Sequence, residues 1–166
     1  MDRLRTGSLL LALALCGGAS AQQPAAGPSP AAAPAMEQLT PEQREALARQ
    51  DAEMAEAALR VMQLVDGNRI GEIWDGASPA MKQTVTRDEF VRQVTIDRNR
   101  LGEVASRASP QVSRSLFRPG QPVPEGLYIN VRSATTFANQ AQPVRELVSF
   151  RLDEDRVWRV SGYSLR

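Results

Sequence analysis

The sequence of 166 residues contains no histidine and a single cysteine, Cys16. Without histidine, the chain cannot assemble Ser-His-Asp or Cys-His nucleophiles, imidazole zinc sites or histidine-ligated haem. Cys16 lies in a segment that we expect to be removed, so the mature chain has no thiol for a disulfide or a thiolate metal site. A Gly-rich phosphate-binding loop is also missing. We therefore expect no metal and no cofactor.

An excess of charge of either sign is also lacking. The formal net charge is +1. Removal of an N-terminal segment containing Asp2, Arg3 and Arg5 leaves 18 basic and 18 acidic residues, a net charge of 0. A balanced chain has no basic patch for nucleic acid and no strong attraction to a membrane surface. We therefore expect no nucleic-acid partner.

The N-terminus has the features of a secretory signal peptide. Arg3 and Arg5 precede an apolar run over residues 9–15, and the small residues 19–21 form an A-x-A cleavage site. The apolar run is too short to span a bilayer as a permanent helix. The pattern predicts cleavage after Ala21 and a periplasmic or secreted mature protein.

Cys16 supports an alternative, a membrane-anchored lipoprotein. Lipoprotein signals place a cysteine directly after the apolar run, preceded by a small residue, whereas Leu15 precedes Cys16 here. Contact with a membrane is thus expected only if Cys16 is lipidated. Residues 22–38, rich in Ala and Pro, lack the apolar side chains that offset ordering entropy and predict a disordered linker. Residues 39–166 remain for a single folded domain.

The first half of this domain has a helical pattern. Thr40 and Gln43 form a capping box that starts a helix, which we expect to end near Val65. Its apolar stripe at three- and four-residue spacing predicts a core-facing side, formed by Met54, Ala58, Val61, Met62 and Val65. Shorter helices are expected over residues 69–75 and from 78–79, and a last one from a second capping box, Thr86 with Glu89, to about residue 100.

From residue 103 the apolar residues recur at every second position, which predicts strands. The expected strands cover residues 104–117, bent near Pro110, then 127–137, 144–152 and 157–165. Trp158 and Tyr163 have opposite parity, so a bulge at residues 161–162 is needed to place both on the core face. Helices followed by strands define an α+β fold. We expect N-terminal helices packed on a curved, four-stranded antiparallel sheet.

One charged residue breaks the alternation of the strands. Glu146 has the parity of Val148 and Phe150, so its carboxylate is expected to point toward the core, where it is costly unless paired. One interpretation is structural: an ion pair with Arg98 or Arg107, or a strand end from which the side chain escapes to water. The other is catalytic: a general base whose pKa is raised by burial, with Tyr128 or Tyr163 as hydroxyl donors.

The acidic run over residues 153–155 falls in the turn between the last two strands. It lacks the spacing and the glycine of an EF-hand loop, so we interpret it as a solvated turn rather than a calcium site.

Several short patterns, in this order, resemble those of a family of exported bacterial domains of unknown function, the DUF4019 family. They extend over about residues 55–165: Leu64–Gly67, Trp74, Ser78, Arg98, Leu101–Gly102, Ser106–Arg107, Pro119–Gly120, Gly126–Tyr128, Phe137, Asn139, Glu146 and Trp158–Tyr163. The resemblance implies an architecture and export. It does not indicate an activity or a mechanism. The order of helices and strands is also similar to the cone-shaped nuclear-transport-factor-2-like superfold, a likeness of fold alone.

Two functions are compatible with these features. The first is a non-catalytic envelope protein that binds a partner protein or a small apolar ligand in the concavity of its sheet. The second is a cone-fold enzyme that uses Glu146 as a general base with Tyr128 or Tyr163. The surroundings of Glu146 discriminate between them, because a base needs a free carboxylate in a pocket and a structural residue needs a saturated one.

Overall fold

The computed structural model describes residues 39–166, which form one compact unit. Two predicted segments lie outside the described residues: the signal peptide (1–21), which contains Cys16, and the linker (22–38). Over residues 39–166, no helix combines the length and the apolar character needed to cross a membrane.

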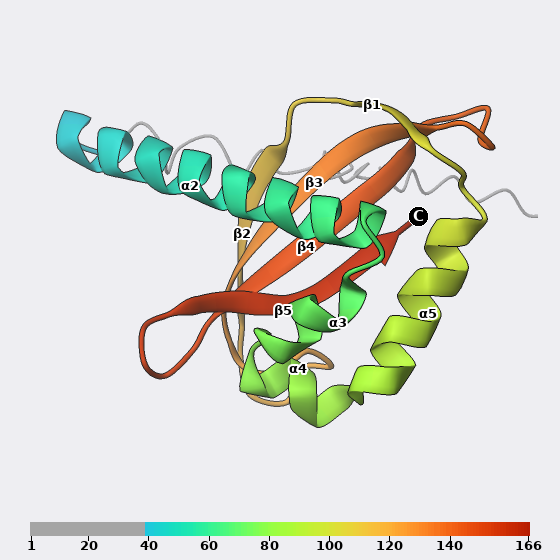
Figure 1. Ribbon diagram of the computed structural model, residues 1–166. Helices are drawn as coiled ribbons and strands as arrows, with labels where there is room; N and C mark the ends of the chain where they lie inside the picture. The colour runs from blue at the N-terminus through green and yellow to red at the C-terminus, as the bar shows by residue number, and fades with distance from the viewer. Residues whose placement is uncertain (1–38) are drawn as a thin grey trace, which may run out of the picture. The chain divides into compact units, whose positions relative to one another are not determined.

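Helix α2 (Pro41–Asp66) begins at the predicted capping box. Thr40 Oγ1 accepts a hydrogen bond from the Gln43 backbone N–H at 3.2 Å, and the Gln43 side chain accepts one from the Thr40 N–H at 2.9 Å. All five residues of the predicted stripe are buried. The first three turns of α2 are mostly exposed, and Figure 1 shows this part of the helix extending past the sheet.

Three shorter helices follow: α3 (Ile70–Asp75), α4 (Pro79–Thr84) and α5 (Arg87–Asn99). Thr86 caps α5 as predicted, because its hydroxyl accepts from the Glu89 N–H at 3.3 Å. The second half of that capping box is not formed. The Glu89 carboxylate instead binds the Arg92 guanidinium at 2.6 and 3.1 Å, a charge-assisted pair that competes well with a neutral N–H.

The sheet has five antiparallel strands, one more than predicted: β1 (Val104–Arg107), β2 (Gln111–Phe117), β3 (Gly126–Phe137), β4 (Val144–Leu152) and β5 (Trp158–Leu165). The expected first strand is divided at residues 108–110, because Pro110 has no N–H for the ladder. Both halves still pair with β3, β2 along its first part and β1 along its end. The order then continues through β4 to β5 at the edge.

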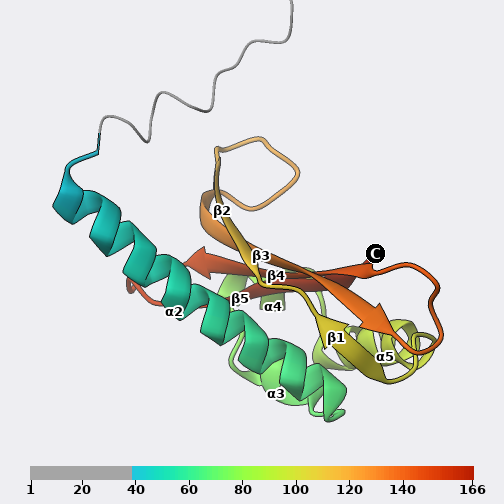
Figure 2. The ribbon, with the colours of Figure 1, turned by 90° about the horizontal axis from the view of Figure 1, so that it is seen from above.

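The core lies between one face of the sheet and the helices. Figure 2 shows α2, α3 and α5 on this side of the sheet. Four sheet residues at its centre are at most 4% exposed, Ile129, Val131, Val148 and Phe150. They pack in one cluster with buried residues of α2, α3, α4 and α5. Side chains therefore fill the concave face that we expected to bind a ligand, and the cone-type likeness stays a prediction.

The predicted bulge in β5 is confirmed. Ser149 on β4 faces Gly162, whereas the next residue, Phe150, faces Val160, so Ser161 is the extra residue. The bulge places Tyr163 on the core face with Val160. Gly162 is not among the glycines with a positive φ, so this bulge does not need the left-handed backbone conformation that favours glycine.

Candidate functional site

Glu146 lies on the inner face of β4, where the alternation of the strand places it. It faces Ser133 on β3 and Leu165 on β5, and its side chain is 0% exposed. Since water does not reach the carboxylate, its charge depends on the protein groups around it.

Four hydrogen bonds saturate the Glu146 carboxylate. Arg107 donates from Nε to Oε2 at 2.8 Å and from Nη2 to Oε1 at 3.3 Å. The Thr135 hydroxyl donates to Oε2 and the Tyr163 hydroxyl to Oε1, each at 2.6 Å. A carboxylate has about four lone-pair sites, so Glu146 has no acceptor left for a substrate proton.

The network continues through Asp66 at the end of α2. Arg107 Nη2 lies 2.7 Å from Asp66 Oδ2, and Arg98 donates to Asp66 Oδ1 from Nε and Nη2, both at 3.1 Å. Arg98 also donates to the Gly102 carbonyl and lies 4.9 Å from the centre of the Phe137 ring. Of the two arginines proposed for Glu146, Arg107 binds it directly, and Arg98 is joined to it only through Asp66 and Arg107.

Sequence reasoning missed Asp66, which entered only as part of the Leu64–Gly67 pattern. An acidic residue in the last turn of a helix is unfavourable next to the negative end of the helix dipole. That conflict was the available signal that Asp66 has cationic partners. Here it accepts from two arginines, one on α5 and one on β1, and links the helical layer to the sheet.

Burial and hydrogen bonding act in opposite directions on Glu146. Burial raises its pKa, but the hydrogen bonds from Arg107, Thr135 and Tyr163 outweigh this effect and leave the pKa below its usual value. Burial, followed by the charge of Glu146, raises the pKa of the Tyr163 hydroxyl. At neutral pH the cluster therefore holds a carboxylate, a guanidinium and a neutral phenol.

This geometry does not suit the catalytic interpretation. A general base works best with a pKa near neutrality, whereas the pKa of Glu146 is lowered. Tyr128 faces Arg151, five positions along β4 from Glu146 and of the opposite parity, and its hydroxyl donates to the Pro124 carbonyl at 2.8 Å. The structure thus brings Tyr163 to Glu146 and keeps Tyr128 away. Residues 39–166 contain no group of three or more side chains placed to hold a metal ion.

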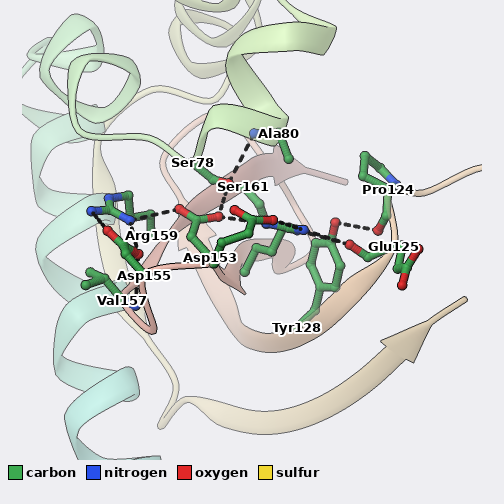
Figure 3. Close-up of polar contacts among 12 residues, drawn as sticks. Ser78, Ala80, Pro124, Glu125, Tyr128, Asp153, Asp155, Val157, Arg159 and Ser161 are labelled. Carbon is green, nitrogen blue, oxygen red and sulfur yellow. Dashed lines mark hydrogen bonds and ion pairs between the residues drawn. The ribbon is translucent and has the colours of Figure 1, made fainter.

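A second buried carboxylate lies in the β4–β5 turn, and it corrects our interpretation of residues 153–155 as a solvated turn. The side chain of Asp153 is only 2% exposed. It accepts hydrogen bonds from Ser78 Oγ at 2.6 Å and Arg159 Nη1 at 3.1 Å (Figure 3). Arg151 Nη1 donates a third hydrogen bond at 2.9 Å. Burial raises the pKa of Asp153, but these bonds outweigh it and lower the pKa. Asp155 is exposed, as expected.

The Asp153 cluster joins the hairpin to the start of α4. Ser78 is the N-cap of α4, and its hydroxyl oxygen also accepts from the Ala80 N–H at 3.3 Å. Sequence reasoning placed Ser78 at the start of a helix and missed its bond to Asp153, because that partner lies 75 residues further along the chain.

An open cleft of about 370 Å³ lies between α5 and the C-terminal end of β5. Its lining combines apolar and polar side chains: Val85, Glu89, Phe90, Gln93, Val94 and Asp97 from the helical side, and residues 163–166 from the strand side. The buried Glu146 is not part of its lining. A second, mostly apolar cleft of about 170 Å³ lies between α2 and the bend that joins β1 to β2.

Helices on one face of an antiparallel sheet, joined to it by two buried ion-pair clusters, define an α+β domain whose inward carboxylates have structural partners. The family model described as "Protein of unknown function (DUF4019)" matches residues 57–163. The chain therefore belongs to the DUF4019 family, and the matched range contains the whole sheet except its last residues. A search of curated proteins and a search of solved structures each found no match.

The lowered pKa values predict acid sensitivity. Glu146 and Asp153 stabilise the fold when ionised, so their contribution is complete above their unfolded pKa values, roughly 4.3 and 3.9, and is lost as the pH falls through the folded values. We expect the urea midpoint to decrease steeply below about pH 4. A variant with Glu146→Gln and Asp153→Asn should show a flatter profile, starting from a lower midpoint. An unchanged slope in this variant would assign the acid sensitivity to other carboxylates.

Proposed function

We propose that this protein is a non-catalytic binding domain of the bacterial cell envelope, exported by its signal peptide and active in the periplasm or outside the cell. The N-terminal pattern of Arg3, Arg5, the apolar run and the A-x-A site supports export. The alternative location is the membrane surface, to which the protein is anchored if Cys16 is lipidated. The linker of residues 22–38 would then tether the domain.

The observation that carries the non-catalytic role is the saturation of Glu146, a buried carboxylate that is not part of the lining of the α5–β5 cleft. The inward carboxylate is held by four hydrogen bonds and is shielded from water, which favours a structural task. The α5–β5 cleft instead offers apolar side chains interspersed with polar and charged ones, which can both bury and orient a partner. We therefore place the binding site in this cleft.

The proposal predicts a position-specific contact in the envelope. A photo-crosslinking amino acid at Gln93, on α5 in the cleft, is expected to give defined cross-linked species when the full chain is expressed in a Gram-negative host. The same substitution at Gln63, an exposed glutamine on α2, serves as the matched control and is expected to give none.

The same cultures test the cellular location and the processing of the chain. Intact mass spectrometry of the periplasmic fraction is expected to show a chain that begins at Gln22. A lipidated chain that begins at Cys16 would replace the soluble form with the tethered one. An unprocessed chain in the cytoplasm, or equal cross-linking at Gln63 and Gln93, would contradict the proposed function.

A further inference from the structure

The C-terminal part of β5 has backbone N–H and C=O groups that form no hydrogen bond with a neighbouring strand. Arg166 and Arg145 exchange both of their backbone hydrogen bonds, at 3.0 and 2.7 Å. Bonded and non-bonded pairs alternate along an antiparallel ladder, so Leu165 opposite Glu146 and Tyr163 opposite Val148 are non-bonded positions. Their N–H and C=O groups therefore point away from β4, toward the free edge of the sheet.

This free edge is covered at one end and open at the other. Near the start of β5, the Ser78 N–H donates to the Val160 carbonyl at 2.8 Å, so the loop before α4 closes the edge there. Over residues 39–166, no turn or loop backbone bonds the outward backbone groups of Tyr163 and Leu165. An exposed edge of this kind is a template for an added strand.

The α5–β5 cleft runs along the open part of the edge. It is lined by the four consecutive residues 163–166. Successive side chains of a strand point to opposite faces, so a cleft that touches all four follows the edge of the strand and not one face. Its other wall is α5, where Phe90 and Val94 provide an apolar surface. An edge strand beside a helix is the arrangement in which peptide-binding domains add a strand.

The acidic groups of the lining indicate the kind of segment that fits, because its one basic group, the exposed Arg166, forms no ion pair with them. Asp97 is half-buried in the cleft wall, and within residues 39–166 it binds only a neutral group, Gln93 Nε2 at 3.1 Å. The other acid of the lining, Glu89, is paired with Arg92. A partly buried carboxylate without a cation favours a ligand that supplies one.

We propose that the cleft binds an extended peptide segment of another protein, which pairs as an additional strand with Tyr163 and Leu165 and directs a basic side chain to Asp97. This inference rests on the proposed binding function and specifies its partner. The peptide supplies main-chain hydrogen bonds for affinity, and its alternate side chains enter the cleft. A second copy of the chain, whose own β5 edge would pair in the same way, is the competing occupant that the test below distinguishes.

The test uses defined peptides on the full mature protein. The probe is a fluorescent five-residue peptide of alternating valine and lysine or arginine, and its affinity is measured by fluorescence anisotropy. There are two matched probes. One carries glutamate in place of the basic residues, and the other carries N-methyl groups on the peptide backbone nitrogens that would face β5. We expect the basic peptide to bind at least about tenfold more tightly than either matched probe, a difference of about 1.4 kcal/mol.

Two variants test the protein side. Asp97→Asn is expected to weaken binding of the basic peptide about tenfold and to leave the acidic probe unchanged. Leu165→Pro removes one outward N–H at the end of an edge strand, where proline is tolerated, and is expected to weaken both probes. Asp97→Asn and the N-methyl probe remain decisive if the proline variant does not fold.

The outcomes separate this inference from the proposed function. Equal affinity for the N-methyl probe, or no binding of the basic peptide at about 1 mM, overturns the added strand. Concentration-dependent dimers in sedimentation experiments that are lost in Leu165→Pro overturn the choice of a peptide in favour of a second copy. In either case, specific cross-linking at Gln93 would leave the binding function standing.

Discussion

Replacing Glu146 with glutamine is expected to lower the free energy of unfolding by roughly 3–5 kcal/mol, because one side of a buried ion pair is removed. Both carboxylate oxygens accept from Arg107, so the amide nitrogen faces an N–H of that arginine in either orientation. The guanidinium also loses a buried counter-charge. For a domain of this size we expect the melting temperature to decrease by roughly 10–20 °C, measured by circular dichroism.

Glu56→Gln is the matched control for this prediction. Glu56 is 76% exposed and lies 3.9 Å from Arg60 one turn away on α2, so its loss should cost less than about 1 kcal/mol. A double change, Glu146→Leu with Arg107→Met, should recover part of the stability, because it leaves neither charge buried alone. If Glu146→Gln keeps the wild-type stability but abolishes ligand binding, Glu146 acts in a binding site and the structural assignment is wrong.

The second large effect is expected at the β4–β5 turn. Asp153→Asn should lower the free energy of unfolding by roughly 2–4 kcal/mol, because a buried carboxylate loses its charge among donors. Oδ1 accepts from Ser78 and Arg151, and Oδ2 accepts from Arg159, so the new amide nitrogen opposes an arginine N–H in either orientation. Urea unfolding followed by tryptophan fluorescence measures the change.

Asp155→Asn provides a control in the same turn. Asp155 also binds Arg159, at 2.9 and 2.7 Å, but its side chain is 54% exposed, so we expect a loss of less than about 1 kcal/mol. Similar losses for the two variants would mean that burial of Asp153 contributes nothing beyond a surface ion pair. A larger loss at Asp155 would contradict the assignment of Asp153 as the link to α4.

The positions of the helices follow from short-range signals. Thr40 and Thr86 cap helices whose first turns begin within three residues of them, and the apolar stripe of α2 repeats every three or four residues. The interruption of the first strand also followed from one residue, Pro110. The sequence predicted a bend there, whereas the structure has two separate strands and therefore five in the sheet. In each case the interacting groups are close in the chain, so the sequence itself contains the relevant geometry.

The composition of the candidate sites depended on the tertiary structure more than the positions of the helices did. Alternation placed Glu146 on the inner face, and parity required the bulge at Ser161 that brings Tyr163 to it. Neither pattern selects Arg107 over Arg98, since both arginines are long enough, one on a strand of the sheet and one on a helix packed against it. The register of β1 against β3 made that choice.

The sequence by itself thus determined where the helices begin, which face of each strand is apolar, and that an inward carboxylate needs a partner. The tertiary structure alone decided that Arg107 is this partner, that Asp66 and Asp153 are held by arginines, and that a cleft follows the open edge of β5. The reason is separation along the chain. Arg107 lies 39 residues from Glu146, Arg98 lies 32 from Asp66 and Ser78 lies 75 from Asp153. Contacts of this range are fixed by the packing of helices on the sheet, which no local pattern encodes.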